Sequence, residues 1–246
     1  MVACEALVRW QHPAKGILSP EAFLPTAEET GMLAPLGWWV LNEACRQMRS
    51  WQNKYEAARE MGVSVNIAGV QLINSEALAL IEGALKESGL DPAFLRLELT
   101  ENGIRQFGEA ATPILRKLKR TGLQVYLDDF GTGYSSLAYL HRLPIDVAKI
   151  DRSFISGRES KNGGHKVVQA MSNLLHELGM KVAVEGVENA AQLNLARSLG
   201  CEIIQGFVLA KPMEAGAFGR FLAHQHLRDE IASLVLSSGD QESRSL

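Results

Sequence analysis

Five short apolar segments of this chain each end in a carboxylate, an amide or a lysine. The polar residues at or just after the segment ends are Asn66, Glu98, Asp128, Asp129, Lys149, Asp151 and Glu185. Such segments, bounded by turn residues, are typical of buried parallel strands, so the polar side chains are expected where the strands leave the core. In a series of strand–helix units these ends share one face, and carboxylates gathered there repel one another unless a cation or a proton intervenes. The pattern predicts a metal site.

The ligand types indicate which metal would bind. The candidate ligands all offer oxygen atoms and are Glu5, Asn66, Glu98, Asp128, Asp129 and Glu185, whereas none of the six histidines lies at a predicted strand end. Oxygen ligands favour magnesium or manganese over zinc. Five carboxylates carry more negative charge than one divalent cation requires, which favours two cations about 3.5–4 Å apart that share a carboxylate, here Asp128. Two such cations suit phosphodiester hydrolysis, with Lys149 either positioning the attacking water or compensating charge.

Each of these residues also has a purely structural interpretation. Asp128 and Asp129 precede a Phe-Gly-Thr-Gly sequence and could cap a turn or a helix. Glu98 and Glu185 could be solvated loop acids, and Lys149 an exposed lysine at a strand end. Their coincidence at equivalent strand ends favours the functional interpretation, because barrel geometry brings those positions together.

The elements that would position these residues alternate along the chain. Helices are predicted over residues 36–55, 75–88, 112–121, 135–143, 165–178, 190–199 and 215–227, and strands over 3–8, 63–66, 95–99, 124–128, 147–150, 181–185 and 202–206. Gly89, Gly122, Gly179 and Gly200 each close a helix before the next strand. In the helix at 36–55, apolar residues at helical spacing predict one buried stripe. The alternation predicts βα units in one domain, residues 1–227, followed by an unassigned extension at 228–246.

Seven predicted strands are one fewer than a closed (β/α) barrel requires. Because the first of them begins near residue 3, we expect the absent strand to lie upstream of Met1. A doubly wound open sheet would tolerate seven strands. In such a sheet, however, mainly the strands at the topological switch point contribute residues to the binding crevice, so that fold would not explain ligand-type residues on nearly every strand. The sequence therefore favours a modified TIM-type (β/α) barrel that lacks one strand.

Composition restricts the classes of function. The net charge of −3 argues against binding of DNA or RNA polymers through a basic surface, while it allows a small anionic ligand held through metal. Cys4, Cys45 and Cys201 are widely spaced, so neither a disulfide framework nor a zinc site is predicted. The chain has no run of about 18 apolar residues that could span a membrane, and its start does not resemble a signal peptide. A reducing, cytoplasmic location is expected.

Six segments carry a recognisable set of motifs. They are residues 5–13 (EALVRWQHP), 98–101 (ELTE), 128–137 (DDFGTGYSSL), 149–154 (KIDRSF), 185–188 (EGVE) and 205–207 (QGF). In sequence and in order they resemble the signature motifs of the EAL domain, a family of bacterial cyclic di-GMP phosphodiesterases, and residues 20–31 are similar to the family's segment after the first motif. The resemblance implies a modified barrel whose first strand is antiparallel to the rest, and hydrolysis of cyclic di-GMP to linear 5′-pGpG.

The resemblance also implies roles for individual residues. The first cation would be held by Glu5, Asn66, Glu98 and Asp128, and the second by Asp128, Asp129 and Glu185. Lys149 would contact the nucleophilic water, and Glu185 and Glu101 would act with it in catalysis. Arg9 would bind a substrate phosphate, and Gln205 and Glu188 would complete the active-site shell. Asp151 is a signature residue near the same mouth of the barrel and is counted with the substrate-binding residues. Magnesium or manganese would support turnover, whereas calcium, with its looser and longer coordination, is expected to inhibit.

Glu101 matches the glutamate that anchors the loop after Asp129, residues 130–137, which in the family couples metal binding to dimerisation. A homodimer is therefore expected, linked in the parent protein to GGDEF or sensory domains. The chain departs from the family at Ala68, Asn102 and Asn189, none of which is a metal ligand. Two alternatives stay open: an EAL domain that binds cyclic di-GMP or a partner protein without turnover, and an unrelated acid-rich barrel such as a metal-dependent lyase of small carboxylates.

Overall fold

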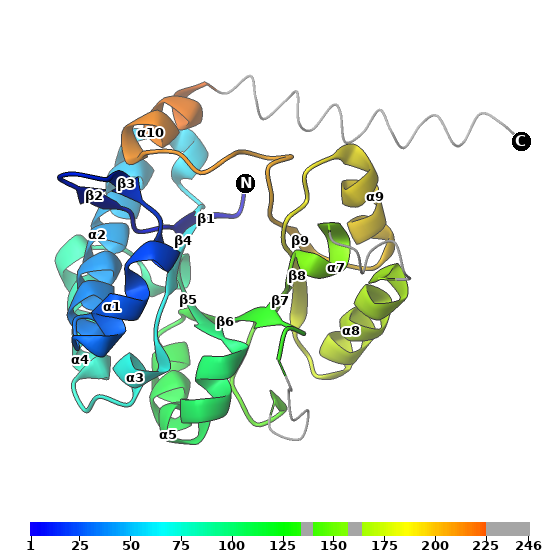
Figure 1. The fold of residues 1–246 in the computed structure, drawn as a ribbon, viewed down its shortest axis with the longest axis horizontal. Coiled ribbons are helices and arrows are strands. Elements are labelled where there is room, and N and C mark those ends of the chain that lie inside the picture. The colour runs from blue at the N-terminus through cyan, green and yellow to red at the C-terminus, as the bar shows by residue number, and fades with distance from the viewer. Residues whose placement is uncertain (134–139, 157–163, 225–246) are drawn as a thin grey trace, which may run out of the picture.

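The computed structural model describes residues 1–133, 140–156 and 164–224. Its main sheet has seven strands, β1 (Ala3–Ala6), β4 (Gly62–Asn66), β5 (Leu95–Thr100), β6 (Gln124–Phe130), β7 (Val147–Ile150), β8 (Lys181–Val184) and β9 (Ile203–Ile204). The strands follow one another across the sheet in chain order, and every neighbouring pair is parallel. The sheet curls around a central axis with the helices outside it (Figure 1), which is the arrangement of a (β/α) barrel.

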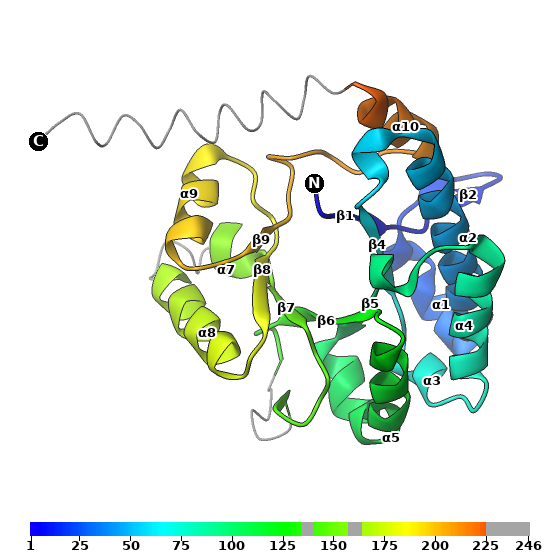
Figure 2. The same cartoon turned by 180° about the vertical axis from the view of Figure 1, so that it is seen from behind.

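Helices cover the outer face of the sheet, as the view from behind also shows (Figure 2). The longer ones are α2 (Leu33–Lys54), α4 (Ala77–Ser88), α5 (Glu101–Arg120), α8 (His165–Glu177), α9 (Ala190–Ser198) and α10 (Ala215–Ala223); α1 (Leu24–Glu29), α3 (Gly69–Leu72), α7 (Ser153–Ser156) and the 3₁₀ turns at Pro20–Ala22, Glu56–Ala58 and Pro92–Phe94 are short. In α2 the residues Leu41, Cys45 and Met48 are buried, so the predicted stripe is confirmed. Gly89 ends α4 in the left-handed conformation, where glycine is favoured.

Strand alternation determines which side chains enter the barrel. The main hydrophobic core, between sheet and helices, contains one set of alternating strand residues, for example Leu97, Val125, Leu127, Ala148 and Val182. A second, smaller cluster of Tyr126, Val147 and Ala183 packs with Ile203 on the opposite face. Because successive side chains of a strand alternate, Glu98, Asp128 and Lys149 share this inner face.

The helix after β5 is longer than predicted. α5 begins at Glu101 rather than near residue 112, because the Thr100 hydroxyl accepts a hydrogen bond from the Gly103 N–H (3.1 Å) and caps the helix. The helix also continues through Pro113. Its buried residues keep helical spacing on both sides of the proline and are Glu101, Ile104, Gly108, Ala111, Leu115 and Leu118. Burial of this face therefore outweighs the lost backbone hydrogen bond.

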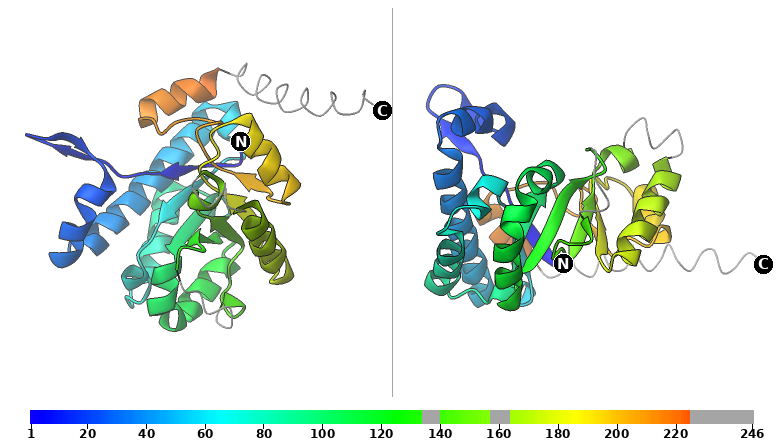
Figure 3. Two further views of the ribbon diagram at one scale, coloured as in Figure 1. Left: turned by 45° about the vertical axis from the view of Figure 1, so that its right-hand side comes forward. Right: turned by 90° about the horizontal axis from the view of Figure 1, so that it is seen from below.

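Two further elements differ from the prediction at the ends of the barrel. The first strand ends at Ala6 rather than residue 8 and is followed by an antiparallel hairpin of β2 (Trp10–His12) and β3 (Gly16–Leu18), which projects from the barrel (Figure 3). The last predicted strand is reduced to Ile203–Ile204. The predicted helix at 135–143 lies mostly outside the described residues, as do residues 225–227 of the last predicted helix.

The curled sheet is open between β1 and β9. Among the described residues β1 pairs only with β4, and β9 pairs only with β8. Side chains nevertheless link the two edges, because Gln205 Nε2 donates a hydrogen bond to Glu5 Oε2 (2.7 Å). The seven parallel strands agree with the predicted modified TIM-type barrel. None of the described helices is long and apolar enough to cross a membrane.

Candidate active site

Four carboxylates surround the ammonium group of Lys149 inside the barrel. Its Nζ lies 2.6 Å from Glu185 Oε1, 2.8 Å from Glu98 Oε2, 3.1 Å from Asp128 Oδ1 and 3.8 Å from Glu5 Oε2. The lysine lies on β7, whereas the acids lie on β1, β5, β6 and directly after β8. The curl of the sheet therefore brings together five strand-end residues that are far apart in the sequence.

The environment of Lys149 fixes its charge. The side chain is 2% exposed, so the alternative of an exposed lysine at a strand end is wrong. Burial alone lowers the pKa of this amine, but the surrounding carboxylates, Glu98 foremost, outweigh burial and hold the pKa of Lys149 above its usual value. The group is therefore a cation at neutral pH.

The acids of the cluster are less easily ionised than usual. Burial raises the pKa of Glu98 and of Glu185 to about 7, although the Lys149 ammonium partly opposes the shift. Burial, followed by the neighbouring Asp128 carboxylate, also raises the pKa of Asp129. One ammonium does not neutralise these acids, so further positive charge would stabilise their ionised forms.

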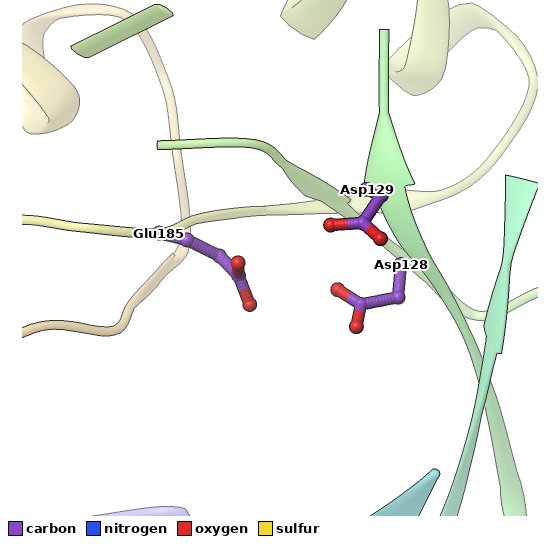
Figure 4. A group of neighbouring side chains, drawn as sticks. All are labelled: Asp128, Asp129 and Glu185. Atoms are coloured by element: carbon purple, nitrogen blue, oxygen red, sulfur yellow. The ribbon is translucent and has the colours of Figure 1, made fainter. Parts of the chain in front are cut away.

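A bulge in β6 lets two consecutive acids reach the site. Successive side chains of a regular strand point to opposite faces, which would direct Asp129 away from Asp128. The register between β6 and β7 shifts between Leu127 and Phe130, and Asp129 has a φ of +56°, the one positive value among the described residues other than glycine. Oxygen atoms of Asp128, Asp129 and Glu185 consequently lie within 4.8 Å of one another (Figure 4), a suitable spacing for ligands of one cation.

Amide side chains orient the carboxylate of Glu5. Asn66 Nδ2 donates a hydrogen bond to Glu5 Oε1 (2.8 Å), and Gln205 Nε2 donates one to Glu5 Oε2 (2.7 Å). Asn66 is also the register partner of Glu98 in the parallel pair β4–β5. Glu5, Asn66 and Glu98 therefore lie side by side on three neighbouring strands, where the resemblance places the first cation.

Glu101 contacts the backbone that follows Asp129. It is 7% exposed, and its Oε2 accepts a hydrogen bond from the Gly131 N–H (2.9 Å). The Glu101 side chain also packs against Gly133: a Cβ atom at position 133 would lie only 2.6 Å from Glu101 Oε1. Residues 134–137 of the predicted loop lie outside the described residues.

A cavity of about 600 Å³ opens beside the carboxylate cluster. Its lining includes Glu5, Glu98, Lys149 and Glu185, together with Arg9, Glu188 and Gln205. Asp151 is not part of this lining; its carboxylate accepts a hydrogen bond from the Ser153 N–H (2.9 Å) at the start of α7. Arg152 and Lys211 also line the cavity but were not predicted. Arg152 could have been suspected from its place in the 149–154 motif, whereas Lys211 belongs to no motif.

The cluster fits hard divalent cations. Its donor set consists of carboxylate oxygens and one amide, without a histidine or thiolate. Asp128 Oδ1 is buried and receives no well-directed hydrogen bond, although the Lys149 ammonium lies 3.1 Å away. A cation shared through Asp128 would satisfy this atom.

Known proteins of similar sequence point to one family. The sequence profile of the EAL domain matches residues 1–212. The chain is 41% identical over 215 residues to the bifunctional diguanylate cyclase/cyclic di-GMP phosphodiesterase MucR of Pseudomonas aeruginosa, covering 87% of this chain. It is 39% identical over 218 residues, 89% of its length, to the cyclic di-GMP phosphodiesterase NbdA of the same organism. The chain spans only 31% and 28% of the lengths of these two relatives.

Solved structures extend the similarity to the fold. The PaMucR phosphodiesterase in complex with c-di-GMP has a TM-score of 0.81 at 41% identity, with 87% of this chain and 86% of that chain covered. The EAL enzyme Bd1971 with cAMP and cyclic-di-GMP bound has a TM-score of 0.83 at 33% identity, covering 90% and 60%. With its sequence matched over residues 1–212 and its fold matched over most of its length, the chain belongs to the EAL domain family.

Proposed function

We propose that this chain is the catalytic domain of a cyclic di-GMP phosphodiesterase, which uses two divalent cations to hydrolyse one phosphodiester bond and release linear 5′-pGpG. The observation that carries the proposal is the convergence of Glu5, Glu98, Asp128 and Glu185 around the buried Lys149. Relatives named cyclic di-GMP phosphodiesterases supply the substrate class.

We assign the ligand sets of the two cations from the resemblance to the EAL domain, and the positions of these residues in the barrel support the assignment. Glu5, Asn66, Glu98 and Asp128 would hold the first cation, and Asp128, Asp129 and Glu185 the second. The oxygen donors favour magnesium or manganese. When bound, two such cations supply Lewis-acid stabilisation of the phosphoryl group and of the departing alkoxide.

Lys149 acts in this proposal through its charge. The surrounding carboxylates hold its pKa above the usual value, so we assign it the role of a charged hydrogen-bond donor rather than that of a general base. Its ammonium can donate a hydrogen bond that orients the attacking water, and it stabilises the negative charge that develops as the phosphodiester bond is attacked.

The cavity lining suits a dinucleotide with two phosphates. Arg9, Arg152 and Lys211 line it and would pair with phosphate oxygens, while Gln205 and Glu188 offer polar groups beside the carboxylate cluster. Phe207 is 52% exposed and lines the same cavity, so its ring is available to a guanine base.

The parent protein would be larger than this chain and would act as a cytoplasmic homodimer. MucR and NbdA are about three times longer than this chain, and the name of MucR combines a diguanylate cyclase with the phosphodiesterase, which supports a link to GGDEF or sensory domains. Glu101 accepts a hydrogen bond from Gly131 at the start of the 130–137 loop, and the resemblance to the EAL domain suggests that this loop couples the second cation site to dimerisation.

A chromatographic assay with purified protein tests the proposal. Cyclic di-GMP should be converted to pGpG in magnesium or manganese, and the Asp128→Asn variant should produce little. Absence of product with both metals, in protein shown to be folded by circular dichroism, would refute catalysis. If calorimetry detects binding of cyclic di-GMP but no pGpG forms, the alternative of a binding domain without turnover is favoured. The sheet is open beside Glu5, which is the structural reason to test this alternative.

A further inference from the structure

Gln71 carries a buried amide at a position where an apolar side chain would be expected. It lies on α3, outside the carboxylate cluster, and is 2% exposed. Its Oε1 accepts a hydrogen bond from the Ala68 N–H (3.0 Å), whereas its Nε2 is buried and has no hydrogen-bond partner among the described residues. A buried amide with an unused donor is less favourable than an apolar side chain of similar size. The hydrogen bond to Ala68 is therefore the interaction that we take to account for a glutamine at this position.

The hydrogen bond to Ala68 fixes the turn that follows Asn66. β4 ends at Asn66, whose Nδ2 donates a hydrogen bond to Glu5 Oε1 (2.8 Å). The backbone of the next two residues is anchored, because the Ile67 N–H donates to a carbonyl of β5 (2.9 Å) and the Ala68 N–H donates to Gln71. Ala68 is the N-cap residue of α3 and has no side-chain oxygen with which to cap the helix itself. Gln71 thus supplies an acceptor that sets the direction in which the chain leaves β4, and with it the position of the Asn66 amide.

Glycine at position 37 makes room for the Gln71 amide. Gly37 lies in the second turn of α2, and a Cβ added there would lie 2.5 Å from Gln71 Nε2 and 2.7 Å from Gln71 Cδ. Glycine is less favourable than alanine inside a helix, so the close approach of the amide explains its presence here. The other side of α3 is packed as closely, because a Cβ added at Gly69 would lie 3.0 Å from the Cγ of Phe107 in α5. α3 therefore has little room to shift, and its anchoring by Gln71 is transmitted to Asn66.

We propose that Gln71 is a positioning residue for the hydrolysis of cyclic di-GMP. Its buried amide, which Gly37 admits, holds the turn after β4 and keeps the Asn66 amide directed at Glu5. Gln71 does not line the cavity, so it acts on the site through Asn66 and does not itself contact substrate. This inference rests on the proposed function in taking Asn66 and Glu5 to be site residues.

Gln71→Met removes the acceptor and keeps the approximate volume of the side chain. Loss of one buried hydrogen bond corresponds to about a 5- to 30-fold change. We expect kcat for cyclic di-GMP and the calorimetric affinity for Mn²⁺ to fall by such a factor, with KM nearly unchanged. Gln52→Met is the matched control, because Gln52 is 6% exposed and its Nε2 donates to Met61 O (3.0 Å) next to the opposite end of β4. That variant should lower the melting temperature without changing kcat or the affinity for Mn²⁺.

Gly37→Ala displaces the Gln71 amide while leaving Gln71 in the chain. Its kcat and its affinity for Mn²⁺ should fall about as far as in Gln71→Met. The melting temperature should stay close to that of the wild type, because alanine favours the helix more than glycine does. Gly83→Ala in α4 is the matched control, since a Cβ added there would meet no atom within 4 Å, and it should keep wild-type kcat and affinity. A purely structural role of Gln71 would instead lower the melting temperature and leave the affinity for Mn²⁺ unchanged.

A double-mutant cycle shows whether Asn66 transmits the effect. Asn66→Ala removes the amide that Gln71 positions, so Gln71→Met should cause little further loss of kcat or of Mn²⁺ affinity in the Asn66→Ala background. Fully additive losses would show that Gln71 acts by another route and would overturn the proposal. If Gln71→Met does not fold, Gly37→Ala takes its place in the same cycle.

The outcomes separate this inference from the proposed function. Wild-type kcat and Mn²⁺ affinity in both Gln71→Met and Gly37→Ala would overturn the positioning role and leave a phosphodiesterase intact. If the wild-type chain forms no pGpG, the proposed function fails, and the Mn²⁺ affinities in the cycle of Gln71→Met with Asn66→Ala still decide the positioning role.

Discussion

Replacement of Glu101 tests how the Asp129 carboxylate is held in the site. Glu101 accepts a hydrogen bond from the Gly131 N–H at 2.9 Å, and Asp129 has a φ of +56°. This left-handed conformation costs roughly 1–2 kcal/mol for a residue with a side chain. A hydrogen bond to a charged acceptor contributes roughly 1.5–3 kcal/mol, which is enough to offset the strain.

In Glu101→Ala the backbone after Asp129 can relax, and the carboxylate then leaves its position near Asp128 and Glu185. A loss of about 2 kcal/mol in positioning corresponds to roughly a 30-fold change, so affinity for the cation of this set and turnover should fall about 10- to 100-fold. Binding at the Glu98 set should persist. α5 should remain intact, because Thr100 rather than Glu101 caps it.

Manganese titration by calorimetry and chromatographic measurement of pGpG check this prediction. Glu109→Ala, an exposed acid on the same helix, is the control and should behave as wild type. Glu101→Gln, which keeps an acceptor oxygen without the charge, should be intermediate. Wild-type affinity and turnover in Glu101→Ala would refute the positioning role, and loss of the Glu98 site in that variant would reverse our assignment within residues 98–101.

Three further predictions follow from the same cluster. Glu5→Gln and Asp128→Asn should each lower turnover by at least about 100-fold with an unchanged circular dichroism spectrum, and wild-type rates would contradict their assignment as ligands. Calcium should bind, as seen by calorimetry, yet support turnover at least about tenfold slower than manganese, because its longer coordination misplaces the reacting groups. Without metal, the melting temperature should fall as pH rises from about 5 to about 8, because burial raises the pKa of Glu98 and Glu185 to about 7. Below that pH the folded protein binds more protons than the unfolded chain, so its stability decreases as pH rises until both carboxyl groups have ionised. Manganese should remove most of that fall, and an equally steep profile in Glu185→Gln would show that other groups cause it.

Much of the site could be predicted because its signal is local. A strand has a period of two residues, so an apolar run that ends in Glu98 or in Asp128 already specifies which face those side chains share with Lys149. Glycines such as Gly89 mark helix ends for an equally local reason, since few other residues adopt a left-handed φ at low cost. The alternating elements, the parallel sheet and the oxygen-rich ligand set follow from these patterns.

Features that depend on non-local packing could not be predicted. The continuation of α5 through Pro113 depends on burial against the sheet, which outweighs the local signal of a proline; the start of the helix at Glu101, by contrast, follows from the local cap by Thr100. The bulge that brings Asp129 beside Asp128 depends on pairing with β7, and a regular strand would have separated the two acids.

The sequence by itself determined which residues stand at the strand ends and what metals their oxygens prefer, because residue type and strand period are properties of short segments. The tertiary structure alone decided that Lys149 is 2% exposed among four acids, and that Gln205 reaches Glu5 across the opening between β1 and β9. These contacts join residues up to 200 positions apart, so they exist only once the sheet has curled. The charge balance of the site is therefore set by the fold, whereas its chemical composition is set by the sequence.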